Sequence, residues 1–139
     1  MGRRALLTAA LVLATGACGG DPRSPRDREA DAAWDALRAS PSDHAWESFR
    51  RANVLAAREH GGAMDARGVT YRLREYEAQA DAAARHTDRD EALRLAFQVI
   101  DEIDGIESRD QFRIYEDAVP GAIERLRRIR AAADEVTRR

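Results

Sequence analysis

Apolar side chains after residue 24 recur at intervals of three and four positions, the spacing that places them on one face of an α-helix. Residues that favour turns separate the segments that carry this pattern. No segment there alternates apolar with polar positions, and no run of Val, Ile and Thr lies between turn residues, so strands are not expected. We therefore predict an all-α fold, a single small bundle of four or five helices covering residues 25–139.

The first two helices have clear start and stop signals. Ser24, followed by a proline and by Asp27, predicts a helix start, because its hydroxyl can accept a hydrogen bond from an unpaired helix amide. Residues 40–42, Ser-Pro-Ser, end that helix and begin the next, which the glycines at 61–62 end. The pattern leaves residues 63–68 open. The apolar faces are Ala30, Trp34 and Leu37 in the first helix, and Ala45, Trp46, Phe49, Ala52 and Ala56 in the second.

Two further helices are predicted, one with apolar positions from Val69 to Ala83 and one with apolar positions from Ala92 to Ile103. Thr87 and Asp90 predict the start of the second of them, and its apolar stripe is the widest, so we expect it to lie deepest. Residues 101–110, acidic around Gly105, predict a loop; a calcium loop does not fit, because carboxylates are missing where its first and twelfth ligands belong. The apolar positions are Val69, Leu73, Tyr76, Ala80 and Ala83, then Ala92, Leu93, Ala96, Phe97, Val99, Ile100 and Ile103.

The last segment contains a proline within an unbroken apolar stripe. Ser108 and Gln111 have the spacing of a capping box, which predicts a helix start there. Pro120 removes one backbone hydrogen bond, yet the apolar period continues across it, so we expect one continuous helix kinked at Pro120. The stripe consists of Phe112, Tyr115, Val119, Ala122, Leu126, Ile129, Ala133 and Val136.

Length and charge restrict the class of protein. A chain of 139 residues forms one domain of modest size. Its net charge of −2 argues against a nucleic-acid partner, which requires a basic excess to displace counterions from phosphates. All 23 basic residues are Arg, so runs of Arg carry less meaning here than elsewhere. Residues 34–37, Trp-Asp-Ala-Leu, resemble the opening of a tetratricopeptide repeat, but the pattern does not recur, which leaves a repeat-like helical pair as an alternative.

The first 20 residues have the composition of a targeting segment. Two arginines precede a run without charged residues, which becomes small at Thr15-Gly16-Ala17-Cys18. This end resembles the lipobox of bacterial lipoproteins, although Thr15 stands where that family prefers Leu. The resemblance implies a signal peptide over 1–17, cleavage before Cys18 and attachment of a diacylglycerol to its thiol, with 18–24 as a tether. The protein would then be exported and anchored to a bacterial membrane, at its periplasmic face or at the cell surface.

Other interpretations of this segment stay open. Cys18 is the single cysteine, whereas the exported compartment favours disulfide pairs, so lipidation explains it best. A plain secretory signal and a retained anchor helix are the alternatives, the latter disfavoured because the apolar run is short for a bilayer. Arg3 and Arg4 also resemble the twin-arginine export motif, so the export route stays open between that pathway and the general one.

The sequence offers no recognisable catalytic set. His44, His60 and His86 are isolated, and none has the spacing of a zinc-binding helix. His60 and His86 are instead expected at helix C-termini, where a partly positive ring meets the helix dipole favourably. Glycine-rich phosphate loops and nucleophile elbows are missing from the sequence. We therefore expect no metal, no cofactor and no enzymatic activity.

Charge is distributed unevenly towards the C-terminus. Residues 86–118 are mainly acidic and residues 121–139 mainly basic. We expect Arg130 to pair with an acid of the preceding helix, and Arg127 and Arg128 to face solvent as possible interaction residues. The sequence thus predicts a non-catalytic protein-binding or scaffolding module of the bacterial envelope, with an unidentified envelope protein as partner. A bundle that binds a small ligand or a metal is the alternative.

Overall fold

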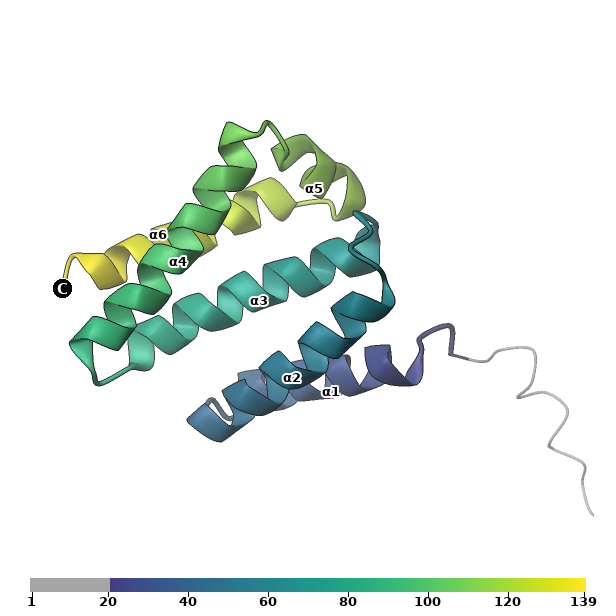
Figure 1. Cartoon of the computed structure of the whole chain (residues 1–139), viewed down its shortest axis with the longest axis horizontal. Helices are drawn as coiled ribbons and strands as arrows, with labels where there is room; N and C mark the ends of the chain where they lie inside the picture. The colour runs from purple at the N-terminus through teal and green to yellow at the C-terminus, as the bar shows by residue number, and fades with distance from the viewer. Residues whose placement is uncertain (1–20) are drawn as a thin grey trace, which may run out of the picture.

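The computed structural model describes residues 21–139, and all its regular structure there is helical (Figure 1). The prediction of an all-α bundle is confirmed. The described residues form six helices, so the expectation of four or five is wrong. They are α1 (Pro25–Ala39), α2 (Asp43–Glu59), α3 (Ala66–Arg85), α4 (Arg89–Ser108), α5 (Phe112–Ala118) and α6 (Ala122–Thr137).

Helix α3 lies at the centre of the arrangement. It packs against α2 on one side and against α4 and α6 on the other, while α1 packs mainly on α2. Figure 1 shows the α1–α2 hairpin and the α4–α6 pair on opposite sides of α3. One stripe of α3 is therefore only partly covered by these two pairs. This stripe forms the floor of grooves at the surface.

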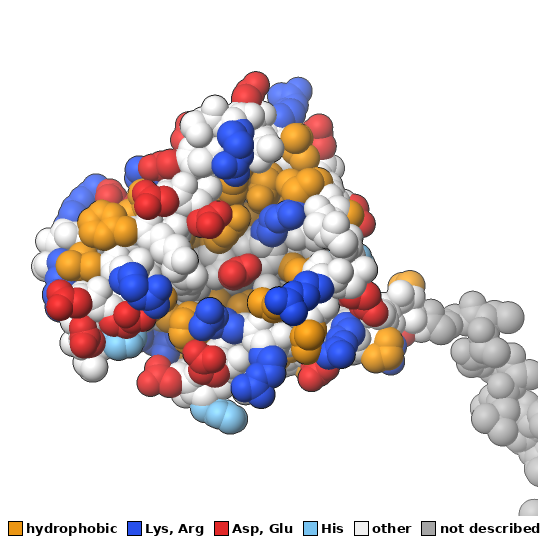
Figure 2. Space-filling model, viewed as in Figure 1, with side chains coloured by type: hydrophobic (Ala, Val, Ile, Leu, Met, Phe, Trp, Pro, Cys, Tyr) orange, Lys and Arg blue, Asp and Glu red, His pale blue; other side chains and the backbone are white. Residues whose placement is uncertain are grey.

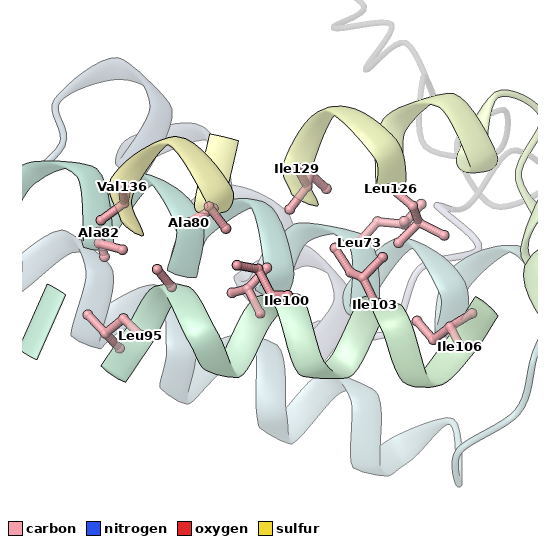
Figure 3. Packing of buried hydrophobic residues seen from close by; sticks show 14 of the residues in the cluster. Leu73, Ala80, Ala82, Leu95, Ile100, Ile103, Ile106, Leu126, Ile129 and Val136 are labelled. Carbon is pink, nitrogen blue, oxygen red and sulfur yellow. The ribbon is translucent and has the colours of Figure 1, made fainter. Parts of the chain in front are cut away.

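The main hydrophobic core lies where α3, α4 and α6 meet. Leu73, Ile103 and Leu126, one from each helix, are fully buried and point toward one another (Figure 3). Smaller clusters join α1 and α2 to α3 around Phe49 and Tyr71. Burial of these apolar surfaces supplies the main stabilisation of the fold.

One aromatic residue of the predicted core lies outside it. Phe97, assigned to the deep face of α4 by its spacing, is 51% exposed, whereas Leu95, which the predicted stripe omitted, is buried. Because α4 packs on both α3 and α6, its buried face is centred on the 92–96–99–103 stripe. Phe97 lies outside that face.

Two helix starts follow the predicted caps, and a third differs by one residue. The hydroxyl of Ser24 accepts the amide of Asp27, the carboxylate of Asp27 accepts the amide of Ser24, and Ser42 caps α2. Helix α4 is capped by Asp88, one residue after Thr87, because its carboxylate accepts the amide of Glu91 at 3.1 Å. The predicted N-termini of α1 and α2 are thereby confirmed.

The corner between α2 and α3, which the sequence left open, is a tight turn. Gly61 and Gly62 have φ of 60° and 75°, the left-handed region that glycine enters without strain. Asp65 then caps α3 through the amide of Gly68, at 2.8 Å. A Cβ atom on Gly68 would lie 1.9 Å from the carbonyl oxygen of Ala63, so this close approach requires glycine.

The chain between residues 101 and 112 differs from the prediction. Helix α4 continues through Gly105 to Ser108, because Ile103 and Ile106 bury their side chains in the core. The loop expected over 101–110 is therefore wrong, as is the capping box. The hydroxyl of Ser108 donates to the carbonyl of Gly105, and Gln111 makes no side-chain cap.

The helical structure is interrupted at Pro120, which separates α5 from α6. The expectation of one kinked helix is therefore wrong. Val119 is extended, because the ring of Pro120 disfavours helical backbone in the preceding residue. Gly121 has φ of 88°, which ends helical geometry locally. The carboxylate of Glu116 accepts the amides of Ile123 and Gly121 at 2.9 and 3.0 Å, which caps α6 and lowers the pKa of Glu116.

The predicted signal peptide, Cys18 and the twin arginines lie outside the described residues. Among residues 21–139, no helix has both the length and the apolar character needed to span a membrane.

Candidate functional site

Two neighbouring hollows lie beside α3, with volumes of about 290 and 260 Å³. They share Glu77 and Asp81, which lie one turn apart on α3. One hollow is walled by α1 and the turn after it, the other by α6. We call the two together the α1–α3–α6 groove. Its lining includes Trp34, Leu37, Arg38, Glu77, Asp81, Arg85, Arg125, Arg128 and Ile129.

Glu77 connects both walls of this groove. Its carboxylate accepts a hydrogen bond from Arg125 of α6 at 2.6 Å, and Arg38 of α1 lies 3.8 Å away on the other side. Arg38 also lies over the ring of Trp34, with its guanidinium carbon 5.3 Å from the ring centroid. The groove thus has Trp34 in one wall, beside an acidic side chain that contacts arginines on both sides.

Arginines outnumber acids in the groove. Arg38, Arg85, Arg125 and Arg128 face only two carboxylates, those of Glu77 and Asp81. Burial, together with the neighbouring carboxylate of Glu77, raises the pKa of Asp81. The groove therefore has an excess of positive charge and favours an anionic ligand.

The structure distinguishes the two arginines that the sequence grouped together. Arg127 and Arg128 are both exposed, but only Arg128 lines the groove. Arg128 lies 3.9 Å from Glu124 of its own helix, an exposed contact that contributes little. Arg130 pairs with Asp104 of α4 at 2.6 Å, which confirms the pairing predicted for it.

The opposite face of α3, between α2 and α4, is mixed in charge. Figure 2 shows acidic and basic side chains interspersed over it. A smaller hollow of about 170 Å³ there is lined by polar side chains, including those of Glu75, Gln79, Gln98 and Glu102. Neither sign of charge dominates on this face. It is therefore less able than the α1–α3–α6 groove to select a charged ligand.

A second polar feature is buried at the corner of α1, α2 and α3. Asp27, in the first turn of α1, is only 5% exposed. Its Oδ1 accepts a hydrogen bond from the hydroxyl of Tyr71 and lies 2.9 Å from Nε2 of His60. Burial opposes its ionisation, but the bonds from Tyr71 and His60 outweigh burial and lower the pKa of Asp27 to about 2. We call these residues, with Glu59, the Asp27 cluster.

Asp31, one turn further along α1, collects three arginines. Arg23, Arg67 and Arg74 each place a guanidinium nitrogen within 3.0 Å of its carboxylate. Burial would raise the pKa of Asp31, but the hydrogen bonds from these arginines lower it well below its usual range. This network fixes α1 on α3, because two of the arginines belong to α3.

Sequence reasoning did not find the Asp27 cluster. Asp27 was interpreted as a capping residue and His60 as a helix terminus; both interpretations are correct but incomplete. The contacts of Asp27 with His60 and Tyr71 join residues 33 and 44 positions apart, and no local pattern reports them. His44 and His86 are exposed and lie outside this cluster.

Comparison with known proteins gives no match: no family model, no curated protein and no solved structure is similar to this chain.

Proposed function

We propose that this protein is a bacterial lipoprotein anchored through Cys18, and that its helical domain binds an acidic segment of another envelope protein in the α1–α3–α6 groove. The observation that carries this proposal is the groove itself, in which arginines from α1, α3 and α6 outnumber the carboxylates of Glu77 and Asp81 and lie beside apolar side chains. Guanidinium groups bind carboxylates through paired hydrogen bonds, so an acidic peptide is the ligand that this lining favours.

The dimensions of the groove favour a peptide over a small molecule. Each hollow, at about 290 and 260 Å³, is below the usual range for small-molecule sites. They lie on either side of the turn of α3 from Glu77 to Asp81, which gives an extended chain two adjacent contact points. An anionic lipid headgroup is a weaker fit, because the arginines line the walls of a hollow rather than a convex face.

The lipid anchor would keep this groove close to a membrane. Helix α1 begins at Pro25, and the chain from Cys18 to that residue spans about 25 Å at most. A diacylglycerol with a further acyl chain holds a protein on a bilayer stably, whereas one chain is marginal. A partner in or near the same membrane would therefore meet the groove at high local concentration.

Site-specific photo-crosslinking in intact cells tests the proposal. A photoreactive residue is placed at Ala132, which lines the groove, or at the adjacent Ala131, which does not; both are exposed. We expect position 132 alone to crosslink to an acidic segment of an envelope protein, as mapped by mass spectrometry. The crosslink should be sensitive to salt, and Arg128→Glu should abolish it. Arg127→Glu, the same charge change outside the groove, should leave most of the crosslink.

Four outcomes would contradict the proposal. Equal crosslinking from positions 131 and 132 would show contact without a groove. Crosslinks to phospholipid alone would make the arginines a membrane-binding surface. An unchanged crosslink in the Arg128→Glu chain would remove the charge recognition. Co-purification of a stoichiometric small ligand would favour the alternative of a ligand-binding bundle.

A further inference from the structure

Three metal-ligating side chains converge at the corner of α1 and α2. One carboxylate oxygen each from Asp27 and Glu59, and one ring nitrogen of His60, lie within 4.8 Å of one another. Nε2 of His60 and Oδ1 of Asp27 are 2.9 Å apart. Among residues 21–139 this is the one group of three or more His, Cys, Asp and Glu side chains close enough to share an ion.

The chemistry of these donors suits a divalent transition metal. Two carboxylates neutralise the charge of the ion, and an imidazole favours Zn²⁺ and its neighbours over Mg²⁺ or Ca²⁺, which take oxygen ligands alone. Ligands of a tetrahedral Zn²⁺ at its usual bond lengths lie about 3.3 Å apart. The present separations therefore require only small side-chain movements, and three protein ligands leave a fourth position for water.

Neighbouring groups hold two of the ligands in place. The hydroxyl of Tyr71 donates to Oδ1 of Asp27, and the backbone amide of Ser24 donates to its Oδ2 at 3.1 Å. The hydroxyl of Ser24 donates to Glu59. Such outer contacts orient the ligands of metal sites and raise their affinity. Glu59 is exposed and the His60 side chain is 23% exposed, so an ion can enter from solvent.

The nearest arginine does not occupy the position of the ion. Nε of Arg67 lies 3.8 Å from Oδ1 of Asp27, but both its terminal nitrogens donate to Asp31, at 3.2 and 3.0 Å. Glu59 makes no ion pair within the described part of the chain. The charge of Glu59 is therefore available to an ion, and Arg67 contacts Asp27 only through the longer 3.8 Å approach of its Nε.

We propose that Asp27, Glu59 and His60 form a binding site for a divalent transition-metal ion, with Zn²⁺ as the best fit. The ion joins the first turn of α1 to the end of α2. It replaces the hydrogen bond between Asp27 and His60. This site is separate from the α1–α3–α6 groove and independent of its partner.

Metal titration of the purified full chain tests the site. The chain carries Cys18→Ser, so that no thiol binds metal, and is kept in mild detergent. Zn²⁺ binding is measured by competition with a chromophoric chelator, and Co²⁺ is used as a probe whose visible absorption reports tetrahedral coordination. We expect one equivalent of each ion to bind, and saturating Zn²⁺ to raise the melting temperature.

Matched variants locate the site. His60→Ala and Glu59→Gln should each weaken Zn²⁺ binding by at least about tenfold and lower the Co²⁺ absorption. His44→Ala and Glu47→Gln, the same changes at exposed positions of α2, should leave both unchanged. Circular dichroism checks that every variant keeps its helices.

Failure of the parent chain to bind either ion would overturn the proposal, as would equal affinity in the His60→Ala and Glu59→Gln chains. Either result would leave the photo-crosslinking from position 132 unaffected, so failure of the metal site and failure of the proposed function are distinguishable.

Discussion

Nε2 of His60 lies 2.9 Å from Oδ1 of Asp27, so the C-terminal cap of α2 touches the first turn of α1. The hydroxyl of Tyr71, from α3, donates to the same oxygen. Three helices thus meet at one buried carboxylate. Because these hydrogen bonds favour the charged form, the pKa of Asp27 falls from 3.8 to about 2 in spite of burial.

The pKa of Asp27 predicts a loss of stability in acid. A carboxyl whose pKa is lower in the folded state stabilises the fold above its unfolded pKa, and this contribution disappears as the pH falls through the folded pKa. For Asp27 the contribution is about 2 kcal/mol, lost between about pH 5 and pH 2. Other carboxyls, notably Asp31, also contribute, so the effect of Asp27 must be isolated with a variant.

Asp27→Asn provides that comparison, because Asn does not titrate. Urea unfolding, followed by circular dichroism, gives the free energy of unfolding of the parent and of the variant. The difference between the two free energies should be about 2 kcal/mol smaller at pH 2 than at pH 5. A difference in the free energy of unfolding that stays constant over this range would contradict the buried, charged state of Asp27.

Substitution of alanine for two helical glycines should change the stability of the protein in opposite directions. A Cβ at Gly68 meets the carbonyl oxygen of Ala63 at 1.9 Å, so Gly68→Ala forces the corner before α3 to move and should cost about 1–3 kcal/mol. A Cβ at Gly105 meets only the flexible end of Arg109, at 3.2 Å. Gly105→Ala should therefore stabilise α4 by about 0.5–1 kcal/mol, through helix propensity.

Chemical denaturation of both variants measures these changes. Equal effects of the two substitutions would be inconsistent with the tight corner at residues 63–68 and with a helical Gly105.

Two apolar residues, both assigned to the core from spacing, should differ sharply in their contribution to stability. Leu126 is fully buried between α3 and α4, so Leu126→Ala should cost about 2–5 kcal/mol. Phe97 is half exposed, and Phe97→Ala should cost less than about 1 kcal/mol. Equilibrium unfolding in urea decides this. A cost of several kcal/mol for Phe97→Ala would place that ring in the core after all.

The proposed anchor predicts that Cys18→Ser abolishes both acylation and membrane retention, because this thiol is the only one in the chain. Labelling with a clickable fatty acid, followed by membrane fractionation, measures both. Ser40→Cys added to the Cys18→Ser chain supplies a thiol at an exposed position, and it should restore neither property. Unchanged mass and retention in the Cys18→Ser chain would show that residues 1–20 are not a lipoprotein signal.

The amino-acid sequence alone determined the fold class and the starts of α1 and α2. Apolar spacing at three and four residues and caps such as Ser24 and Ser42 act within one or two helical turns, so they are visible along the chain. The buried faces of α1, α2 and α3 largely followed from this period. The distribution of charge also indicated correctly that Arg130 pairs with an acidic residue of α4, which is Asp104.

The tertiary structure decided what depends on distant neighbours. Whether the chain kinks or breaks at Pro120 depended on Val119, Gly121 and the cap from Glu116 acting together. The exposure of Phe97 depended on how α4 is rotated between α3 and α6. The groove and the Asp27 cluster exist only because residues more than 30 positions apart in the sequence are packed together. This packing is fixed by hydrophobic burial, which is non-directional, so a local sequence pattern does not show which distant residues will meet.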